Sequence, residues 1–191
     1  MIRLGERRSA TGDATALLSE CHQRIRSFLA LARRIGAADL TDDRDLREAA
    51  AGVHRYFTQA LPLHARDEEE SVLPRLRGRD AALDSALDQM AREHAEHARP
   101  LAALVGACGA LVAEPGRHRQ LAPTIAGAAE ELERHFEVHL RREEEVIFPA
   151  MRRLLEPAAD AAIVKELRAR RAPIGERGGS AGPTPAIPDA G

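Results

Sequence analysis

The chain is poor in aromatic residues, and this scarcity bears on its fold class. Aromatic residues make up 3% of the 191 residues and tryptophan is absent, whereas 44% of the residues are hydrophobic, mostly alanine and leucine. This composition favours helices over a β-sandwich, whose strands are rich in tyrosine, valine and tryptophan. A chain of this length ordinarily forms one domain with a core of its own. We therefore expect an all-α protein.

The chain also lacks an excess of either charge and any long apolar run. The formal net charge is −2, with both signs mixed along the sequence. Such a charge distribution offers no basic surface for a nucleic acid or an anionic membrane. The polar N-terminus is not followed by an apolar run of signal-peptide length, and no stretch could span a bilayer. We expect a cytoplasmic protein with neither nucleic acid nor membrane as a partner.

Cysteine is scarce as well, since only Cys21 and Cys108 are present. Neither belongs to a Cys-x-x-Cys pair, which suits two reduced thiols in a cytoplasmic chain better than a disulfide or a zinc site. Cys21 adjoins His22 in the sequence. Because neighbouring residues of a helix point about 100° apart, we do not expect Cys21 to share a ligand role with His22.

What the chain does contain is a repeated motif. Residues 64–74 read HARDEEESVLP and residues 139–149 read HLRREEEVIFP, so both copies contain His-x-x-x-Glu. Residues four apart lie on one face of a helix, one turn along, so each copy aims an imidazole and a carboxylate at the same point. This is the geometry of metal ligands, with His64 and Glu68 in one copy and His139 and Glu143 in the other.

Each motif is preceded by a lone histidine at a similar distance, His22 in the first half and His94 in the second. The chain therefore reads as two similar helical hairpins, each with one lone histidine and one His/Glu pair. Four helices could enclose one site.

Alternating spacings of three and four between inward-facing residues predict four long helices, over about residues 13–35, 46–68, 83–111 and 121–143. Pro62 should kink the second of them. Residues 157–171 could form a short fifth helix, whose basic end is expected to be solvated rather than to dock a partner. The expected organisation is thus a flexible N-terminus (1–12), a four-helix bundle (13–156), a short C-terminal helix (157–171) and a disordered tail (172–191).

The inner stripes of these helices hold histidines and acids in place of leucines. A single histidine on such a stripe is more often a structural core residue than a ligand. Burying many polar groups among leucines costs several kcal/mol for each one that has no partner, and a pair of cations would compensate for all of them. The residues concerned are His22, His64, Glu68, His94, His97, His135, His139 and Glu143.

The order H, HxxxEE, H, HxxxEE, with Val72-Leu73-Pro74 and Ile147-Phe148-Pro149 closing the two motifs, resembles the hemerythrin family, and in particular its bacterial HHE cation-binding members. The resemblance covers about residues 13–155. It implies an up-down-up-down four-helix bundle around two iron ions bridged by an oxo or hydroxo group. By position, His22 and His64 would serve one iron, His94 and His139 the other, and Glu68 and Glu143 would bridge them.

The resemblance leaves two positions open. Oxygen-carrying members have a fifth histidine, and here either His97 or His135 could supply it, with His135 slightly favoured because four-residue spacing holds it near His139. Their second acid stands five residues after its histidine, where this chain has Glu144. The remaining acids of the two motifs should mostly lie on a solvated face, although Glu69 and Glu144 could turn inward with a small helix rotation.

Several functions are compatible with this pattern. One is a binding module for dioxygen, another small diatomic ligand or iron itself, used in sensing, storage or transport. Another is a di-iron oxidoreductase that acts on peroxide, dioxygen or nitrogen oxides. Zinc or manganese could replace iron, because both accept histidine and carboxylate ligands. A structural helical protein without metal is the remaining alternative, and no protein partner can be named.

Overall fold

The structure is a computed structural model that describes residues 13–37 and 42–172. The flexible N-terminus expected over residues 1–12 and the tail expected beyond residue 172 lie outside the described residues. Within the described ranges every regular element is a helix, so the all-α prediction is confirmed. None of these helices combines the length and the apolar character needed to cross a bilayer.

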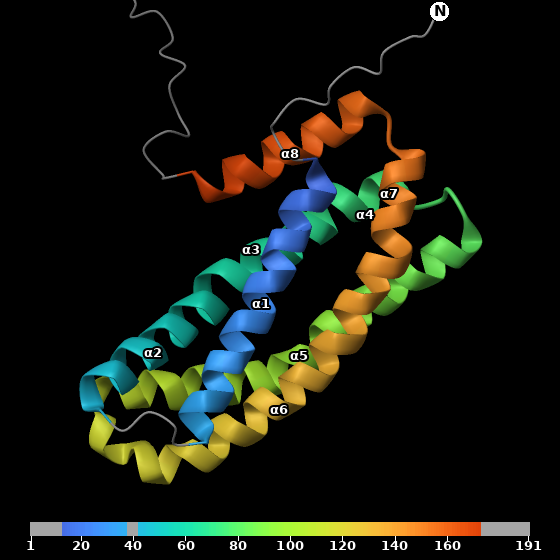
Figure 1. Cartoon of the computed structure of the whole chain (residues 1–191). Helices are drawn as coiled ribbons and strands as arrows, with labels where there is room; N and C mark the ends of the chain where they lie inside the picture. The colour runs from blue at the N-terminus through green and yellow to red at the C-terminus, as the bar shows by residue number, and fades with distance from the viewer. Residues whose placement is uncertain (1–12, 38–41, 173–191) are drawn as a thin grey trace, which may run out of the picture.

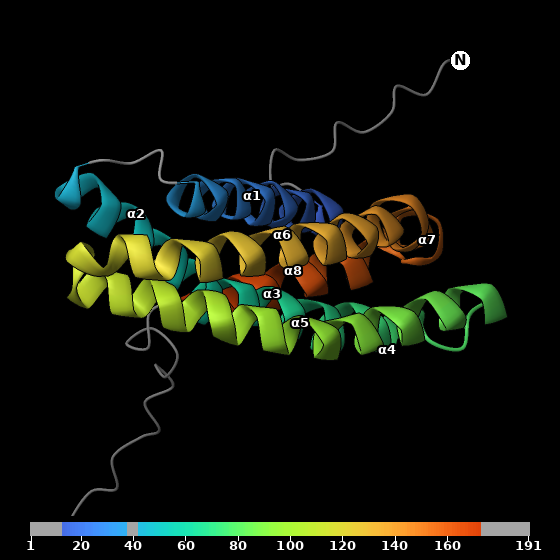
Figure 2. The same ribbon diagram turned by 90° about the horizontal axis from the view of Figure 1, so that it is seen from below.

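Four antiparallel rods form the bundle (Figures 1 and 2). α1 packs against both α2 and α6, and α5 packs against the same two helices, so neighbours along the chain are also neighbours in space. This is the up-down-up-down arrangement that the resemblance in the motifs implies. The rods are α1 (Ala14–Gly36), the run from α2 (Asp43–Arg55) through α3 (Leu61–Arg66) to α4 (Leu73–Leu76), α5 (Ala81–Ala113), and the run from α6 (His118–Arg142) to α7 (Phe148–Leu154).

An aspartate caps the N-terminal end of three of these rods. The side chain of Asp13 accepts a hydrogen bond from the backbone N–H of Ala16, and Asp42 and Asp80 cap α2 and α5 in the same way. A capping carboxylate satisfies backbone donors that the first helical turn leaves free.

Three π-helical turns interrupt the rods, and each lies just before a proline. They are η1 (Tyr56–Ala60), η2 (Asp67–Val72) and η4 (Glu143–Ile147), which are followed by Leu61-Pro62, Leu73-Pro74 and Phe148-Pro149. In η2 the N–H of Leu73 bonds to the carbonyl of Glu68, five residues back. A proline has no N–H to donate and its ring crowds the carbonyl four residues earlier, which opens the preceding turn. The kink expected at Pro62 therefore takes the form of a wide turn.

The apolar core consists of two clusters with a polar layer between them. One cluster has members between Ile25 and Leu140 and fills the end of the bundle where α1 is followed by α2. The other has members between Ala14 and Leu167 and fills the opposite end. On α1, His22 lies between Leu18 of one cluster and Ile25 of the other. The layer between the clusters is where the buried histidines and glutamates gather.

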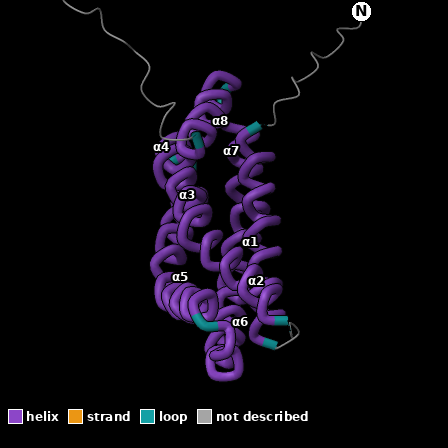
Figure 3. The backbone as a smooth tube through the Cα atoms, turned by 90° about the vertical axis from the view of Figure 1, so that its left-hand side faces the viewer, coloured by secondary structure: helices purple, strands orange, loops and turns teal. Residues whose placement is uncertain are grey.

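A further helix, α8 (Pro157–Arg171), lies across the end of the bundle near α4 and α7 (Figures 1 and 3). It packs against η2 and α1, and Ile163 and Leu167 join the second apolar cluster. The short fifth helix predicted from the sequence is present, and its position brings it next to the first motif.

Candidate metal centre

The polar layer brings one histidine from each rod against two buried glutamates. Glu68 Oε1 lies 2.9 Å from His64 Nε2, and its Oε2 lies 3.1 Å from His94 Nε2. Glu143 repeats the arrangement, with Oε2 3.1 Å from His22 Nε2 and Oε1 2.8 Å from His139 Nε2. Each glutamate therefore faces one histidine from each half of the chain.

These donors fall into two overlapping groups. His22, His64, Glu68 and Glu143 offer ligand atoms that all lie within 4.8 Å of one another, as do Glu68, His94 and His139. Glu68 belongs to both groups. Imidazole nitrogens and carboxylate oxygens at this spacing suit two neighbouring cations that share a carboxylate.

The hydrogen bonding of the layer tests whether these residues fit metal ions. His64 Nε2, both carboxylate oxygens of Glu68, and Glu143 Oε1 are buried and have no hydrogen-bond partner among the described residues. They lie at contact distance from other polar atoms but do not point at them as hydrogen-bonded groups do. Buried polar atoms without partners are rare in proteins and call for an explanation. Cations between them would satisfy all of these atoms at once, so the residues fit.

The charges of the layer support the same conclusion. Burial alone lowers the pKa of His64, but the carboxylate of Glu68 outweighs it and holds that pKa well above its usual range. Burial raises the pKa of Glu68, yet His64 and His94 bring it well below the ordinary value. In the metal-free protein, protons on His64 and His94 thus balance the charge of Glu68. A metal ion can take over this role, because ligands release their protons when they bind one.

Three of the four histidines are fixed through their second nitrogen by another carboxylate. His22 Nδ1 bonds to Glu144 and His94 Nδ1 to Glu69, both at 2.8 Å, and His139 Nδ1 bonds to Glu93 at 3.0 Å. Such contacts orient a ligand imidazole and raise its basicity.

The π-helical turns explain why two consecutive glutamates serve each motif. A π turn holds more residues than an α turn and is wider, so the residue five places after the histidine can reach the edge of the layer while the residue four places after it points inward. Glu68 and Glu143 occupy the inner position, with 2% and 1% exposure. Glu69 and Glu144 remain partly exposed but reach the second nitrogen of a histidine on a neighbouring rod. Their exposure agrees with the prediction that they belong mostly to a solvated face, and each carboxylate also bonds to a histidine of the layer.

Glu93 is the contributor that the sequence analysis missed. It is 7% exposed, bonds to His139 and pairs with Arg142 on α6. Its spacing, three residues after Met90 and four before His97, places it on the apolar stripe of α5. The sequence could have indicated this role, because Glu93 places a carboxylate on that apolar stripe and is next in sequence to His94.

The two candidates for a fifth histidine differ in their surroundings. His97 is 3% exposed, and its ring lies 5.2 Å from that of His139 between centroids. His135 is only half-buried, and its ring lies 5.8 Å from that of His97. Neither joins the two donor groups found within the described part of the chain. The preference for His135 as a ligand therefore stays a prediction, and His97 lies deeper in the layer.

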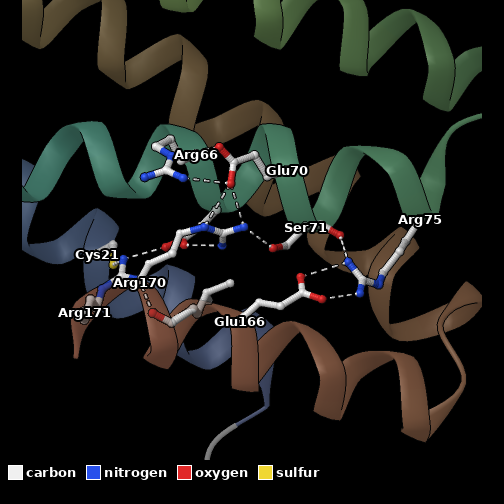
Figure 4. Close-up of polar contacts among 10 residues, drawn as sticks. Cys21, Arg66, Glu70, Ser71, Arg75, Glu166, Arg170 and Arg171 are labelled. Atoms are coloured by element: carbon white, nitrogen blue, oxygen red, sulfur yellow. Dashed lines mark hydrogen bonds and ion pairs between the residues drawn. The ribbon is translucent and has the colours of Figure 1, made fainter. Parts of the chain in front are cut away.

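Helix α8 is tied to the turn that carries Glu68. Asp67 is fully buried and pairs with Arg170 at 2.8 Å and with Arg171 at 2.5 Å. Figure 4 shows Arg170 reaching from α8 to Ser71 and Glu70 on the facing rod. The basic end of α8 was expected to be solvated. For Arg170 and Arg171 this expectation was wrong, because both hold η2 in place.

Comparison with known proteins agrees with the resemblance seen in the motifs. The family model of the hemerythrin HHE cation binding domain matches residues 13–108, which include His22, His64, Glu68 and His94. No curated protein matches the chain. The second His/Glu motif follows the matched range, and the structure brings it to the same buried layer. With half of its residues matched and a buried His/Glu cluster that fits metal ions, the chain belongs to the hemerythrin HHE cation-binding domain family.

Proposed function

We propose that the protein is a non-haem di-iron protein that binds dioxygen or another small diatomic ligand for sensing, storage or transport. His22 and His64 would hold one iron, and His94 and His139 the other. The observation that carries the proposal is that Glu68 and Glu143 each face a histidine of both halves, as bridging carboxylates would. Bound iron would supply redox chemistry and coordination positions for a small ligand.

The surroundings of the site support a small ligand. A cavity of about 130 Å³ adjoins His64, His94 and His139, and the rest of its lining is apolar apart from His97. A cavity of about 150 Å³ can hold a molecule the size of benzene, so this one has room for a small ligand of a few atoms. Its lining contains no acid, and its only titratable side chains are histidines.

Metal analysis followed by optical spectroscopy tests this proposal. The protein would be purified without added metal and its spectrum recorded under argon, in air and with peroxide. We expect two irons per chain and an absorption band that appears with dioxygen and disappears when dioxygen is removed. Zinc or manganese in place of iron, or no bound metal, would contradict the di-iron assignment. A band that decays while peroxide is consumed would instead favour an oxidoreductase.

A pair of variants links the result to the glutamates. Glu68→Gln removes a charge from the centre, while Glu137→Gln removes one from an exposed position on α6 that pairs only with Arg141 among the described side chains. The first should lose iron and the second should retain it. Equal iron content in the two variants would mean that Glu68 is not a ligand.

A further inference from the structure

The cavity beside the centre contains a polar group that the proposed ligand set does not use. His97 lines it together with His64, His94 and His139, and the remaining lining residues are apolar: Phe57, Leu61, Pro62, Ala65, Leu101 and Phe136. Pro62 is exposed and Ala65 and Leu101 are partly exposed, so the cavity reaches the surface between α3 and α5. A small molecule entering there meets His97 before the buried carboxylates.

The Nε2 atom of His97 has no hydrogen-bond partner within residues 13–37 and 42–172. This atom is buried and makes no hydrogen bond to any described residue, and the whole side chain is only 3% exposed. An unpaired buried nitrogen costs free energy. Because His97 is the one histidine of the lining that the proposed ligand set does not use, its unpaired nitrogen points to a ligand in the cavity that completes its hydrogen bonding.

The position of the ring separates His97 from the metal donors. It packs on Phe136, with centroids 4.2 Å apart, and meets the His139 ring edge to face at 5.2 Å. Its centroid lies 6.4 Å from that of His94. Within the described residues, no nitrogen of His97 joins either cluster of converging ligand atoms. His97 lies one helical turn after His94 on the same face of α5, and both rings line the cavity.

We propose that His97 is not a metal ligand but donates a hydrogen bond to the small ligand held in this cavity. The inference rests on the proposed function and names the residue that sets ligand retention. An imidazole carries at least one N–H in either protonation state. A diatomic molecule that gains negative charge on binding to iron would accept from it, whereas the apolar walls offer no competing partner.

Ligand dissociation rates test this role in the iron-loaded protein. The probes are dioxygen on the reduced protein and azide on the oxidised protein, followed by stopped-flow absorbance. His97→Phe keeps a ring but removes the donor, and His97→Gln restores an N–H. His54→Phe is the matched control, because His54 is partly buried on α2 and lies outside both donor groups. We expect dissociation to be about tenfold faster in the Phe variant, the equivalent of one hydrogen bond, less affected in the Gln variant, and unchanged in the control.

The outcomes separate the inference from the proposal beneath it. Loss of one iron from His97→Phe, or a changed spectrum of its ligand-free centre, would show that His97 binds metal and would overturn the inference. Unchanged dissociation in a variant that retains both irons would overturn it too. If neither probe binds the iron-loaded wild-type protein, the proposed function itself fails.

A measurement on metal-free protein adds an independent readout. His97→Phe removes an unpaired buried nitrogen, so the melting temperature of this variant should be higher than that of the wild type. Such a rise is expected where a functional residue lowers the stability of the fold. The His54→Phe control should show no such rise. A fall in the melting temperature for both His97 variants would identify His97 as a packing residue and contradict the inference.

Discussion

Removal of the two arginines that hold Asp67 should destabilise the protein strongly. Asp67 is fully buried, and its two oxygens pair with Arg170 and Arg171. Breaking a buried ion pair leaves an uncompensated charge and costs about 3–5 kcal/mol. The side chain of Arg171 is 33% exposed and that of Arg170 is 13% exposed, so solvent screens part of the interaction. We expect the Arg170→Met/Arg171→Met variant to lose about 3 kcal/mol, near the lower end of that range.

Urea unfolding of metal-free protein, followed by circular dichroism, measures this loss. Arg168→Met is the control, because Arg168 is exposed on the same helix, and its stability should change by less than about 0.5 kcal/mol. Adding Asp67→Leu to the double variant removes the stranded charge and should restore most of the stability. The reasoning is refuted if the double variant is as stable as the control, or if Asp67→Leu gives no recovery in that background.

Three further changes probe other contacts. Glu93→Gln weakens the carboxylate that orients His139 and should reduce metal affinity about 10- to 100-fold; competition with a chelator measures it, and an unchanged affinity would contradict the assigned role. A Cβ at Gly36 would lie 2.7 Å from the Ala126 backbone, so Gly36→Ala should lower the melting temperature while leaving iron content intact. Burial raises the pKa of Cys108 from its ordinary value of 9.0 to about 12, so above pH 9 the unfolded chain ionises first and folding stability falls. At pH 10 this loss is about 1.4 kcal/mol, and Cys108→Ala should lack that part of the decline in denaturant titrations.

The sequence was sufficient to predict the rods and the convergence of their inner faces. Apolar spacing placed the four helices, and the repeated His-x-x-x-Glu placed His64 with Glu68 and His139 with Glu143. Both follow from helical periodicity, which is a local property that one chain reveals. Once the four helices are placed, few packing arrangements bury all of their inner faces.

The supporting contacts could not be predicted in the same way. The contacts of Glu69 with His94 and of Glu144 with His22 depend on the backbone path through the π turns, which the sequence does not reveal. The pairing of Asp67 with Arg170 depends on where α8 docks, which no spacing within α8 determines. Contacts between elements that are distant in sequence depend on tertiary packing, and local sequence patterns carry no information about that packing.

Anomalous X-ray diffraction at the iron edge tests the central claim most directly. Crystals of protein purified without added metal should show two iron peaks, one among His22, His64, Glu68 and Glu143 and the other among Glu68, His94 and His139. A single peak would contradict the bridging role of Glu68. No peak in this layer, in protein shown to carry iron, would refute the account of the site while leaving the helical fold in place.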